Sequence, residues 1–239
     1  MNPTRRSTPP ALSESPKPTH ELDAGLLSTT GEPGGCALFG PLHYEPRYAY
    51  PLIVWLHGPG GDPQQLRRIM PLVSMRNYVA AAPASAGDSA APCWPQTRDS
   101  IHWAEAAVAG AIAAAANRYH VAPRRVFLAG FDAGGTMALR VALNRPVEFG
   151  GAISLCGAFP HGMLPFRHII EARRMPILLA VGRDSVRYPP ESFCEDLRLF
   201  HTAGLSVTLR QYPCGHELSP QMLRDIDRWI IDQITSPPA

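Results

Sequence analysis

The chain has 239 residues, a formal net charge of +2 at pH 7, and charged residues at only 18% of its positions. This length suits one large domain, which by size scaling buries roughly 70% of its unfolded surface without disulfides or metals. The small net charge, without a basic stripe interleaved with aromatic residues, argues against a nucleic-acid-binding protein.

The first part of the chain is rich in proline and polar residues. Five prolines lie among Ser, Thr and Glu within residues 1–18. Such a segment has too little apolar surface to offset the entropy lost on ordering. We therefore expect a disordered tail over residues 1–34 and a single folded domain over residues 35–236.

Short apolar runs that follow the tail predict the strands of a sheet. They cover residues 52–57, 78–82, 125–129, 151–155, 177–181 and 206–212. Most of these runs are continuously apolar, which is typical of strands that helices cover on both faces.

Longer amphipathic segments alternate with these runs and predict helices over residues 63–75, 99–119, 133–144, 190–203 and 219–234. Asp62, with Pro63 behind it, and Asp99 are expected at the N-termini of the first two helices. The alternation predicts an α/β fold with a doubly wound, mostly parallel sheet and helices on both faces. Ligands of such sheets bind at the carboxyl ends of the strands.

A strand-to-helix turn at residues 130–135 is the most informative motif. It reads Gly-Phe-Asp-Ala-Gly-Gly and has the form of the G-x-S-x-G nucleophile elbow. Gly130 and Gly134 are small enough for the chain to reverse sharply and to raise one strained side chain above the sheet. That side chain belongs to Asp132, where the elbow usually has serine.

Three further segments at predicted strand ends carry polar groups. The glycine-rich turn from His57 to Asp62 is expected to donate main-chain N–H groups to a substrate oxygen. Asp184 follows the strand over residues 177–181, and His216 follows the strand over residues 206–212. The order of elbow, acid and histidine is that of the α/β-hydrolases, and Asp184 is expected to orient His216 as a general base.

With these four segments the chain resembles the phospholipase/carboxylesterase group of α/β-hydrolases, small esterases without a cap domain that include acyl-protein thioesterases. The resemblance extends roughly over residues 37–235. It implies a hydrolase of carboxylic esters or thioesters, with nucleophile, acid and base at Asp132, Asp184 and His216. It also implies main-chain donors for the substrate oxygen at Ala133 and in the glycine-rich turn, where we select Gly60.

Two positions depart from the group's pattern. Asp132 replaces the serine, and Pro59, at the position of the first oxyanion donor, has no N–H group. A carboxylate that attacks an ester carbonyl forms an anhydride, so ordinary acyl-enzyme chemistry is disfavoured. Loss of the nucleophile costs about 10⁶ in turnover in a serine hydrolase, which predicts weak or altered esterase activity.

Three other functions stay open. Asp132 suits attack at a saturated carbon, as in enzymes that resemble epoxide hydrolases and haloalkane dehalogenases. Asp132 and His216 could instead activate water directly. Alternatively, Asp132 caps the following helix in a catalytically inactive binding protein.

The substrate expected from this pattern is a small-molecule ester or acyl compound. Trp94, Phe131 and Pro59 are candidates for contact with it. No cofactor or metal is expected, since five scattered cysteines show no C-x-x-C pair and the histidines show no metal-ligand spacing. No apolar run is long enough for a signal peptide or a membrane span, so we expect a cytoplasmic protein, of open oligomeric state.

Overall fold

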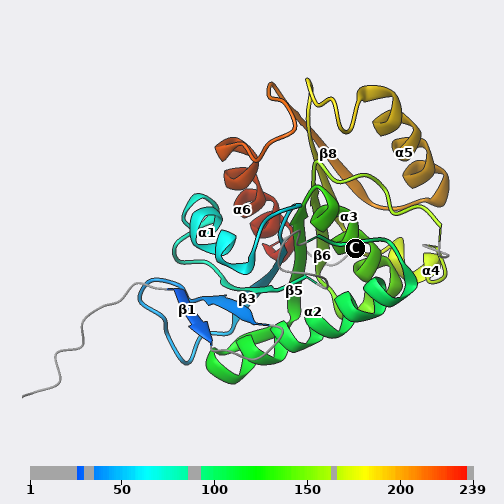
Figure 1. Cartoon of the computed structure of the whole chain (residues 1–239). Helices are drawn as coiled ribbons and strands as arrows, with labels where there is room; N and C mark the ends of the chain where they lie inside the picture. The colour runs from blue at the N-terminus through cyan, green and yellow to red at the C-terminus, as the bar shows by residue number, and fades with distance from the viewer. Residues whose placement is uncertain (1–25, 30–34, 86–92, 163–165, 236–239) are drawn as a thin grey trace, which may run out of the picture.

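The computed structural model describes residues 26–29, 35–85, 93–162 and 166–235 (Figure 1). Within these ranges one sheet has eight strands in the order β1-β2-β4-β3-β5-β6-β7-β8. Their bounds are β1 (Leu26–Thr29), β2 (Cys36–Phe39), β3 (Tyr50–Leu56), β4 (Val79–Pro83), β5 (Val121–Phe131), β6 (Gly151–Leu155), β7 (Ile177–Gly182) and β8 (Val207–Tyr212). The two pairings of β2 are antiparallel and the other five are parallel, which confirms the predicted fold class.

The six predicted strands are all present, and the structure adds β1 and β2 at one edge of the sheet. β1 lies inside the range predicted as tail, where it pairs with β2 from Leu26 opposite Phe39 to Thr29 opposite Cys36. The predicted start of the domain at residue 35 is therefore too late. Main-chain hydrogen bonds to a neighbouring strand hold such an edge, and average composition does not reveal them. The remainder of the predicted tail lies outside the described residues.

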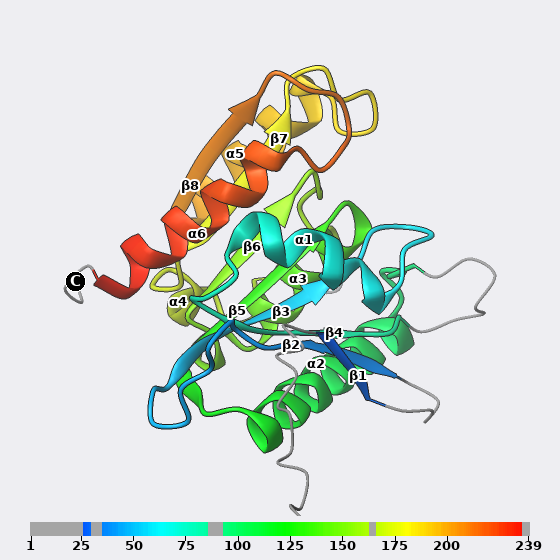
Figure 2. The same ribbon diagram turned by 90° about the vertical axis from the view of Figure 1, so that its left-hand side faces the viewer.

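Helices cover both faces of the sheet (Figures 1 and 2). Their bounds are α1 (Leu66–Val73), α2 (Arg98–Arg118), α3 (Ala133–Asn144), α4 (Ile169–Ala172), α5 (Pro190–Ala203) and α6 (Pro220–Thr235), with short 3₁₀ turns at Pro63–Gln65 and Pro146–Glu148. α1 and α6 pack on one face, while α2, α3 and α5 pack on the other.

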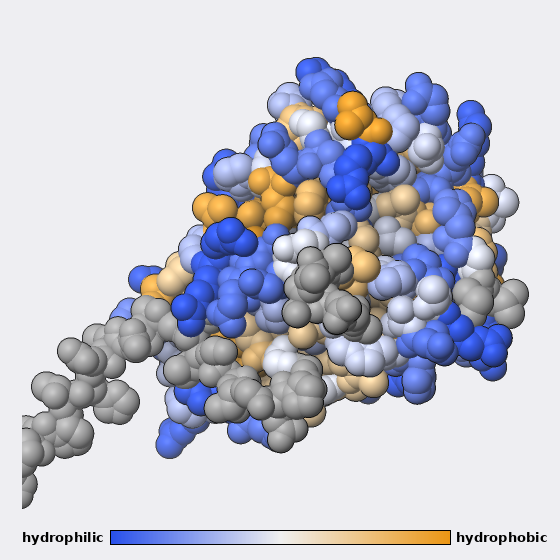
Figure 3. Space-filling model, viewed as in Figure 1, coloured by the Kyte–Doolittle hydropathy of each residue, from blue (hydrophilic) through white to orange (hydrophobic). Residues whose placement is uncertain are grey.

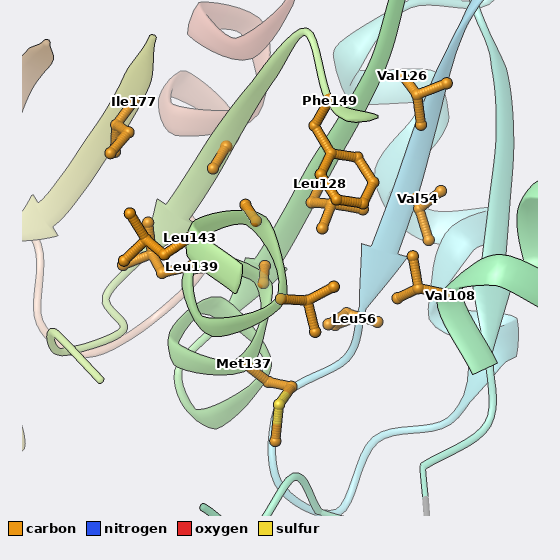
Figure 4. Close-up of a cluster of buried hydrophobic side chains, with 14 of the residues drawn as sticks. Val54, Leu56, Val108, Val126, Leu128, Met137, Leu139, Leu143, Phe149 and Ile177 are labelled. Carbon is orange, nitrogen blue, oxygen red and sulfur yellow. The ribbon is translucent and has the colours of Figure 1, made fainter. Parts of the chain in front are cut away.

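The sequence pattern explains which side each helix buries. α1 buries Leu66, Ile69, Met70 and Val73, at the spacing of one helical face. Figure 4 shows the core on the other side of the sheet, where side chains of α2 and α3 meet those of β3, β5 and β7. Each face of the sheet is thus sealed by apolar side chains, and polar chemistry is confined to the strand ends.

The predicted helix starts differ from the observed ones. α2 begins at Arg98, one residue before the expected position, and Thr97 is its N-cap, because the Thr97 hydroxyl accepts a hydrogen bond from the Ser100 amide at 3.3 Å. Asp99 instead lies in the first turn. Asp62 precedes a 3₁₀ turn and its side chain makes no capping hydrogen bond. Several polar residues near a helix start compete for the cap, and the sequence alone does not rank them.

Strand register places the loops of interest beside one another. Gly130 of β5 is aligned with Leu56 of β3 and with Ser154 of β6, and Gly182 of β7 is aligned with Tyr212 of β8. The carboxyl ends of these five strands therefore form one edge of the sheet. On the face in Figure 3, apolar residues form small separate patches among polar ones, so this view shows no broad apolar surface.

Candidate active site

The turn between β5 and α3 has the strained backbone that its sequence predicts. Asp132 has φ 51° and ψ −122°, a conformation that costs a residue with a side chain about 1–3 kcal/mol. A Cβ on Gly130 would lie 2.4 Å from the carbonyl oxygen of Gly134, and a Cβ on Gly134 would lie 2.2 Å from the carbonyl oxygen of Leu56. Glycine is therefore required at both positions, and the prediction of an elbow geometry is confirmed.

The elbow carboxylate contacts the histidine that follows β8. Oδ2 of Asp132 lies 2.9 Å from Nε2 of His216. Both side chains are mostly buried, with exposed fractions of 15% and 8%. The structure thus brings together two of the three residues that the sequence selected as catalytic.

The third selected residue, Asp184, forms no hydrogen bond or ion pair with His216 in the described part of the chain. The Asp184 carboxylate is 61% exposed and pairs with Arg183 at 3.2 Å. The next residue, Ser185, places its hydroxyl 2.9 Å from Nδ1 of His216. The expected pairing of Asp184 with His216 is therefore wrong by one residue. Alternate side chains of a tight turn point in opposite directions, and the sequence does not say which one faces inward.

The hydrogen bonds around the imidazole determine its tautomer. Oδ2 of the ionised Asp132 can only accept, so Nε2 of a neutral His216 carries the proton. The Ser185 hydroxyl accepts a hydrogen bond from the Tyr188 amide at 3.1 Å, which leaves its own proton for Nδ1. In a serine hydrolase the carboxylate faces Nδ1 and the hydroxyl faces Nε2. Here the hydroxyl and the carboxylate are exchanged.

Ser185 cannot act as the nucleophile of this exchanged triad. Its exposed fraction is 3%, so a substrate carbonyl has no path to the hydroxyl. Ser185 instead orients the imidazole from the buried Nδ1 side, whereas Asp132 contacts Nε2 and is 15% exposed.

A positive charge that the sequence reasoning missed lies beside Asp132. Nη1 of Arg187 is 2.9 Å from Oδ2 of Asp132, and the Arg187 side chain is 59% exposed. Arg187 is in the loop after β7, in a segment whose charges look like ordinary surface charges in the sequence. The one sequence signal for Arg187 is its position two residues after Ser185, in the loop that follows β7. This signal becomes useful only when the fold shows that the loop lies against the elbow.

The glycine-rich turn lies next to the elbow, as expected. The Gly61 amide closes it on the Gly58 carbonyl at 3.0 Å, and Gly60 has a φ of 69°. Pro59 and Gly60 are exposed at its tip. On the other side, the Ala133 amide lies at the start of α3, where a helix leaves its N–H groups without internal partners.

Two of the expected substrate contacts have different positions. Trp94 is only 2% exposed, and its indole N–H donates to the His57 carbonyl at 3.0 Å, so it supports the glycine-rich turn from beneath. The expected contact of Trp94 with substrate is not what this geometry provides. Phe131 is half-buried, with its ring 5.5 Å from that of His216 and against Gly58. Phe131 therefore forms part of the wall beside the imidazole.

His57 is a second histidine near the site, and it is fully buried. Its Nδ1 lies 2.9 Å from the Gly58 carbonyl, and its Nε2 has no hydrogen-bond partner in the described structure. Burial lowers the pKa of His57. The Gly58 carbonyl and the charge of Asp62 act in the opposite direction, but burial is the largest effect and favours the neutral imidazole under the turn.

The cysteine nearest the elbow is not activated. Cys156 is buried, and burial raises the pKa of its thiol to about 11. Among the described residues no three His, Cys, Asp or Glu side chains are grouped so that they could hold a metal ion. In the same part of the chain, no helix combines the length and apolarity needed to cross a membrane.

The strained turn after β5, the histidine after β8 and the mostly parallel sheet between two helical layers define an α/β-hydrolase. A family model described as Phospholipase/Carboxylesterase matches residues 96–234. The chain belongs to this family, which confirms the resemblance read from the motifs.

Relatives and solved structures agree with this placement. The "Probable carboxylesterase SOBER1-like" of Arabidopsis thaliana is 29% identical over 121 residues, which cover 48% of this chain and 44% of that protein. The "Putative esterase NocK" of Nocardia uniformis subsp. tsuyamanensis is 33% identical over 141 residues, or 55% of this chain and 39% of that protein. The matches thus span less than half the length of these curated relatives.

Two crystal structures show the same fold. Arabidopsis thaliana SOBER1 has a TM-score of 0.65 and 24% identity, and the match covers 78% of this chain and all of that one. Zea mays acyl-protein thioesterase 2 has a TM-score of 0.66 and 18% identity, with coverage of 83% and 98%. At these identities the likeness concerns the fold.

Proposed function

We propose that the protein is a hydrolase of the carboxylesterase type, which acts slowly on small carboxylic esters or thioesters and forms no acyl-enzyme. The observation that carries this proposal is the 2.9 Å contact between Oδ2 of Asp132 and Nε2 of His216 at the strained elbow. Membership of an esterase family and the printed names of the relatives support the substrate class.

Asp132 acts in this proposal as the general base. Nδ1 of His216 faces a buried hydroxyl and Nε2 already carries a proton, so the imidazole has no lone pair toward the substrate. Oδ1 of Asp132, by contrast, has no hydrogen-bond partner among the described residues. A positioned general base contributes typically 10²–10⁴-fold to a rate, far less than a full triad.

The reaction follows from these roles. Oδ1 of Asp132 takes a proton from a water molecule while the water oxygen bonds to the ester carbonyl carbon. The tetrahedral intermediate then collapses, the bond to the leaving oxygen or sulfur breaks, and the proton on Asp132 passes to that atom. The Ala133 amide donates to the carbonyl oxygen, where Pro59 provides no second N–H group.

Arg187 and His216 hold the carboxylate in place through the same oxygen, Oδ2. Oδ1 takes no part in this shared contact, which is made by Oδ2 alone. Attack by Asp132 at a saturated carbon is disfavoured, because among the described residues Nδ1 faces the Ser185 hydroxyl and not a carboxylate that would help the imidazole activate water in the second step.

A binding protein without turnover is the second candidate. Two contacts of Asp132 favour this candidate. The carboxylate already accepts a hydrogen bond from Nε2–H of His216 and forms an ion pair with Arg187 when no substrate is bound. In this case the site holds a small ester or acyl ligand.

For location we propose the cytoplasm. No disulfide bond joins the cysteines of the described residues, as is usual for proteins of that compartment.

The test compares initial rates with p-nitrophenyl acetate and with an acetyl thioester. Asp132→Asn is expected to lower kcat/KM about 100-fold, and His216→Gln is expected to lower it as well. Asp184→Asn is the matched control, because it removes an exposed carboxylate from the neighbouring loop and is expected to leave the rate unchanged. A fluorophosphonate should not label the wild-type protein. Equal rates for wild type and Asp132→Asn would remove the esterase proposal and leave the binding protein.

A further inference from the structure

Asp196 is a buried carboxylate that the proposed reaction does not use. It lies in α5 with an exposed fraction of 2% and is the only buried Asp or Glu in the described part of the chain. An ionised carboxylate away from water costs several kcal/mol unless donors surround it. The residues that donate hydrogen bonds to Asp196 therefore indicate its role in the structure.

One donor connects Asp196 with the imidazole of the site. The Tyr188 hydroxyl donates to Oδ2 of Asp196 at 2.5 Å. The main-chain amide of the same tyrosine donates to the Ser185 hydroxyl at 3.1 Å, and that hydroxyl lies 2.9 Å from Nδ1 of His216. Hydrogen bonds, joined through the covalent framework of Tyr188, thus connect Asp196 with Ser185 and His216 and end at Asp132 on the far side of the imidazole.

Tyr188 is a rigid link in this chain. Its ring is 5% exposed and packs edge-on against Phe193 of α5, with ring centroids 5.6 Å apart. Burial and the contact with Asp196 both raise the pKa of Tyr188, so its hydroxyl stays protonated and remains a donor. When the ring is fixed, its main-chain amide is fixed too.

A second donor connects the same carboxylate with the loop after β6. The Phe159 amide donates to Oδ2 of Asp196 at 2.7 Å, and the exposed His161 ring lies 3.4 Å from Oδ1. The neighbouring Ala158 carbonyl accepts from the Thr136 hydroxyl of α3 at 2.9 Å. The carboxylate therefore joins the loop beside the elbow helix to the loop that carries Ser185.

We propose that Asp196 is a positioning residue of the site. Through Tyr188 its carboxylate holds the Ser185 hydroxyl against Nδ1 of His216, and this contact, together with the Asp132 carboxylate on the other side, fixes the imidazole as the Nε2–H tautomer. The inference on the tautomer stands on the hydrogen-bond geometry alone. Only its effect on turnover rests on the proposed function.

The matched experiment uses two buried tyrosines that each donate to an aspartate. Tyr188→Phe removes the hydrogen bond to Asp196. Tyr78→Phe removes an equivalent one to Asp227, 2.9 Å long, at the start of β4 and the opposite end of the sheet. Each variant loses one hydrogen bond to a charged acceptor and is therefore expected to lower the midpoint of thermal unfolding by a similar amount. Thermal unfolding measures this common loss.

The decisive measurement is the pair of ¹⁵N chemical shifts of the His216 imidazole, assigned by comparison with His216→Gln. The wild type and Tyr78→Phe are expected to show a single Nε2–H tautomer. Tyr188→Phe and Asp196→Asn are expected to show shifts moved toward the average of two tautomers. Tyr188→Phe keeps the test valid if Asp196→Asn does not fold.

Turnover is the second measurement. Displacement of a catalytic group by about 1 Å costs about 100-fold, so Tyr188→Phe should lower kcat about 10-fold to 100-fold more than Tyr78→Phe does. Unchanged ¹⁵N shifts in folded Tyr188→Phe would overturn the inference, whatever the rates are. If the wild type has no esterase activity, the shifts still decide the role of Asp196, and only the proposed function fails.

Discussion

Exchange of residues 132 and 185 is expected to create a working serine esterase. Asp132 faces Nε2 of His216 and Ser185 faces Nδ1, each at 2.9 Å, which is the reverse of a serine hydrolase triad. The double variant Asp132→Ser with Ser185→Asp puts a hydroxyl at the strained elbow and a carboxylate behind the imidazole. The Tyr188 amide, 3.1 Å from the Ser185 hydroxyl, then becomes a donor to that carboxylate.

The expected gain can be estimated from the two positions. Asp132→Ser alone supplies the nucleophile but leaves Nδ1 facing a neutral hydroxyl. In a serine protease triad, the loss of the carboxylate's charge and tautomer control lowers kcat about 10⁴-fold. The double variant is therefore expected to exceed Asp132→Ser by about 10³–10⁴, or about 4–5.5 kcal/mol of activation free energy. Pro59 still provides no oxyanion donor, which keeps the rate about 10²–10³ below that of a complete site.

The assay measures hydrolysis of p-nitrophenyl acetate and labelling by a fluorophosphonate. The control is Asp132→Ser with Ser185→Ala, which should be no faster than Asp132→Ser. Because Ser185 is 3% exposed, the larger side chain costs about 1–3 kcal/mol of packing strain, which thermal unfolding will reveal. A folded double variant that is no faster than Asp132→Ser would refute the assignment of Ser185 to the place of the acid.

Three further predictions concern the strain, packing and charge around the site. Asp132→Gly should be about 1 kcal/mol more stable than Asp132→Ala in urea unfolding, because glycine relieves the φ of 51°, and the reverse order would disprove stored strain. Gly134→Ala places a Cβ 2.2 Å from a main-chain carbonyl of β3 and should destabilise by about 3 kcal/mol or more, whereas Gly110→Ala in α2 meets nothing within 4 Å and should gain up to about 1 kcal/mol. Burial lowers the pKa of His57 from 6.5, so the unfolded chain binds more protons than the folded protein at pH values between 6.5 and the lower pKa of the folded state. The free energy of unfolding should therefore fall as the pH drops below 6.5, with a slope of up to about 1.4 kcal/mol per pH unit. His57→Gln should remove this part of the slope and exposed His102→Gln should not, so identical pH profiles for all three proteins would contradict it.

The elements that could be predicted are those with a local physical cause. The apolar runs gave six of the eight strands, since a buried parallel strand needs apolar side chains on both faces. The strands β1 and β2 were missed because main-chain pairing supports them and their sequences are too short for a pattern. Thr97 was missed as the N-cap of α2 because Asp99, two residues later, also has a side chain that can accept a hydrogen bond from a main-chain amide at a helix start.

The sequence by itself determined the elbow. Gly130 and Gly134 permit a backbone that no larger residue allows, and the residue midway between them takes the strained position at the apex of the turn, so Asp132 was identified without coordinates. The order along the chain likewise identified His216, because the carboxyl ends of parallel strands lie on one edge of the sheet.

Only the tertiary structure decided what faces those two residues. Asp184, Ser185 and Arg187 are neighbours in one loop, and the direction of each side chain depends on how that loop turns against β8, where the Asp184 amide bonds to the Cys214 carbonyl at 3.0 Å. The loop therefore places the Ser185 hydroxyl, and not the Asp184 carboxylate, against the His216 imidazole, and it places the Arg187 guanidinium against Asp132. Side-chain direction in a loop is set by contacts with distant segments, and a linear sequence does not contain those contacts.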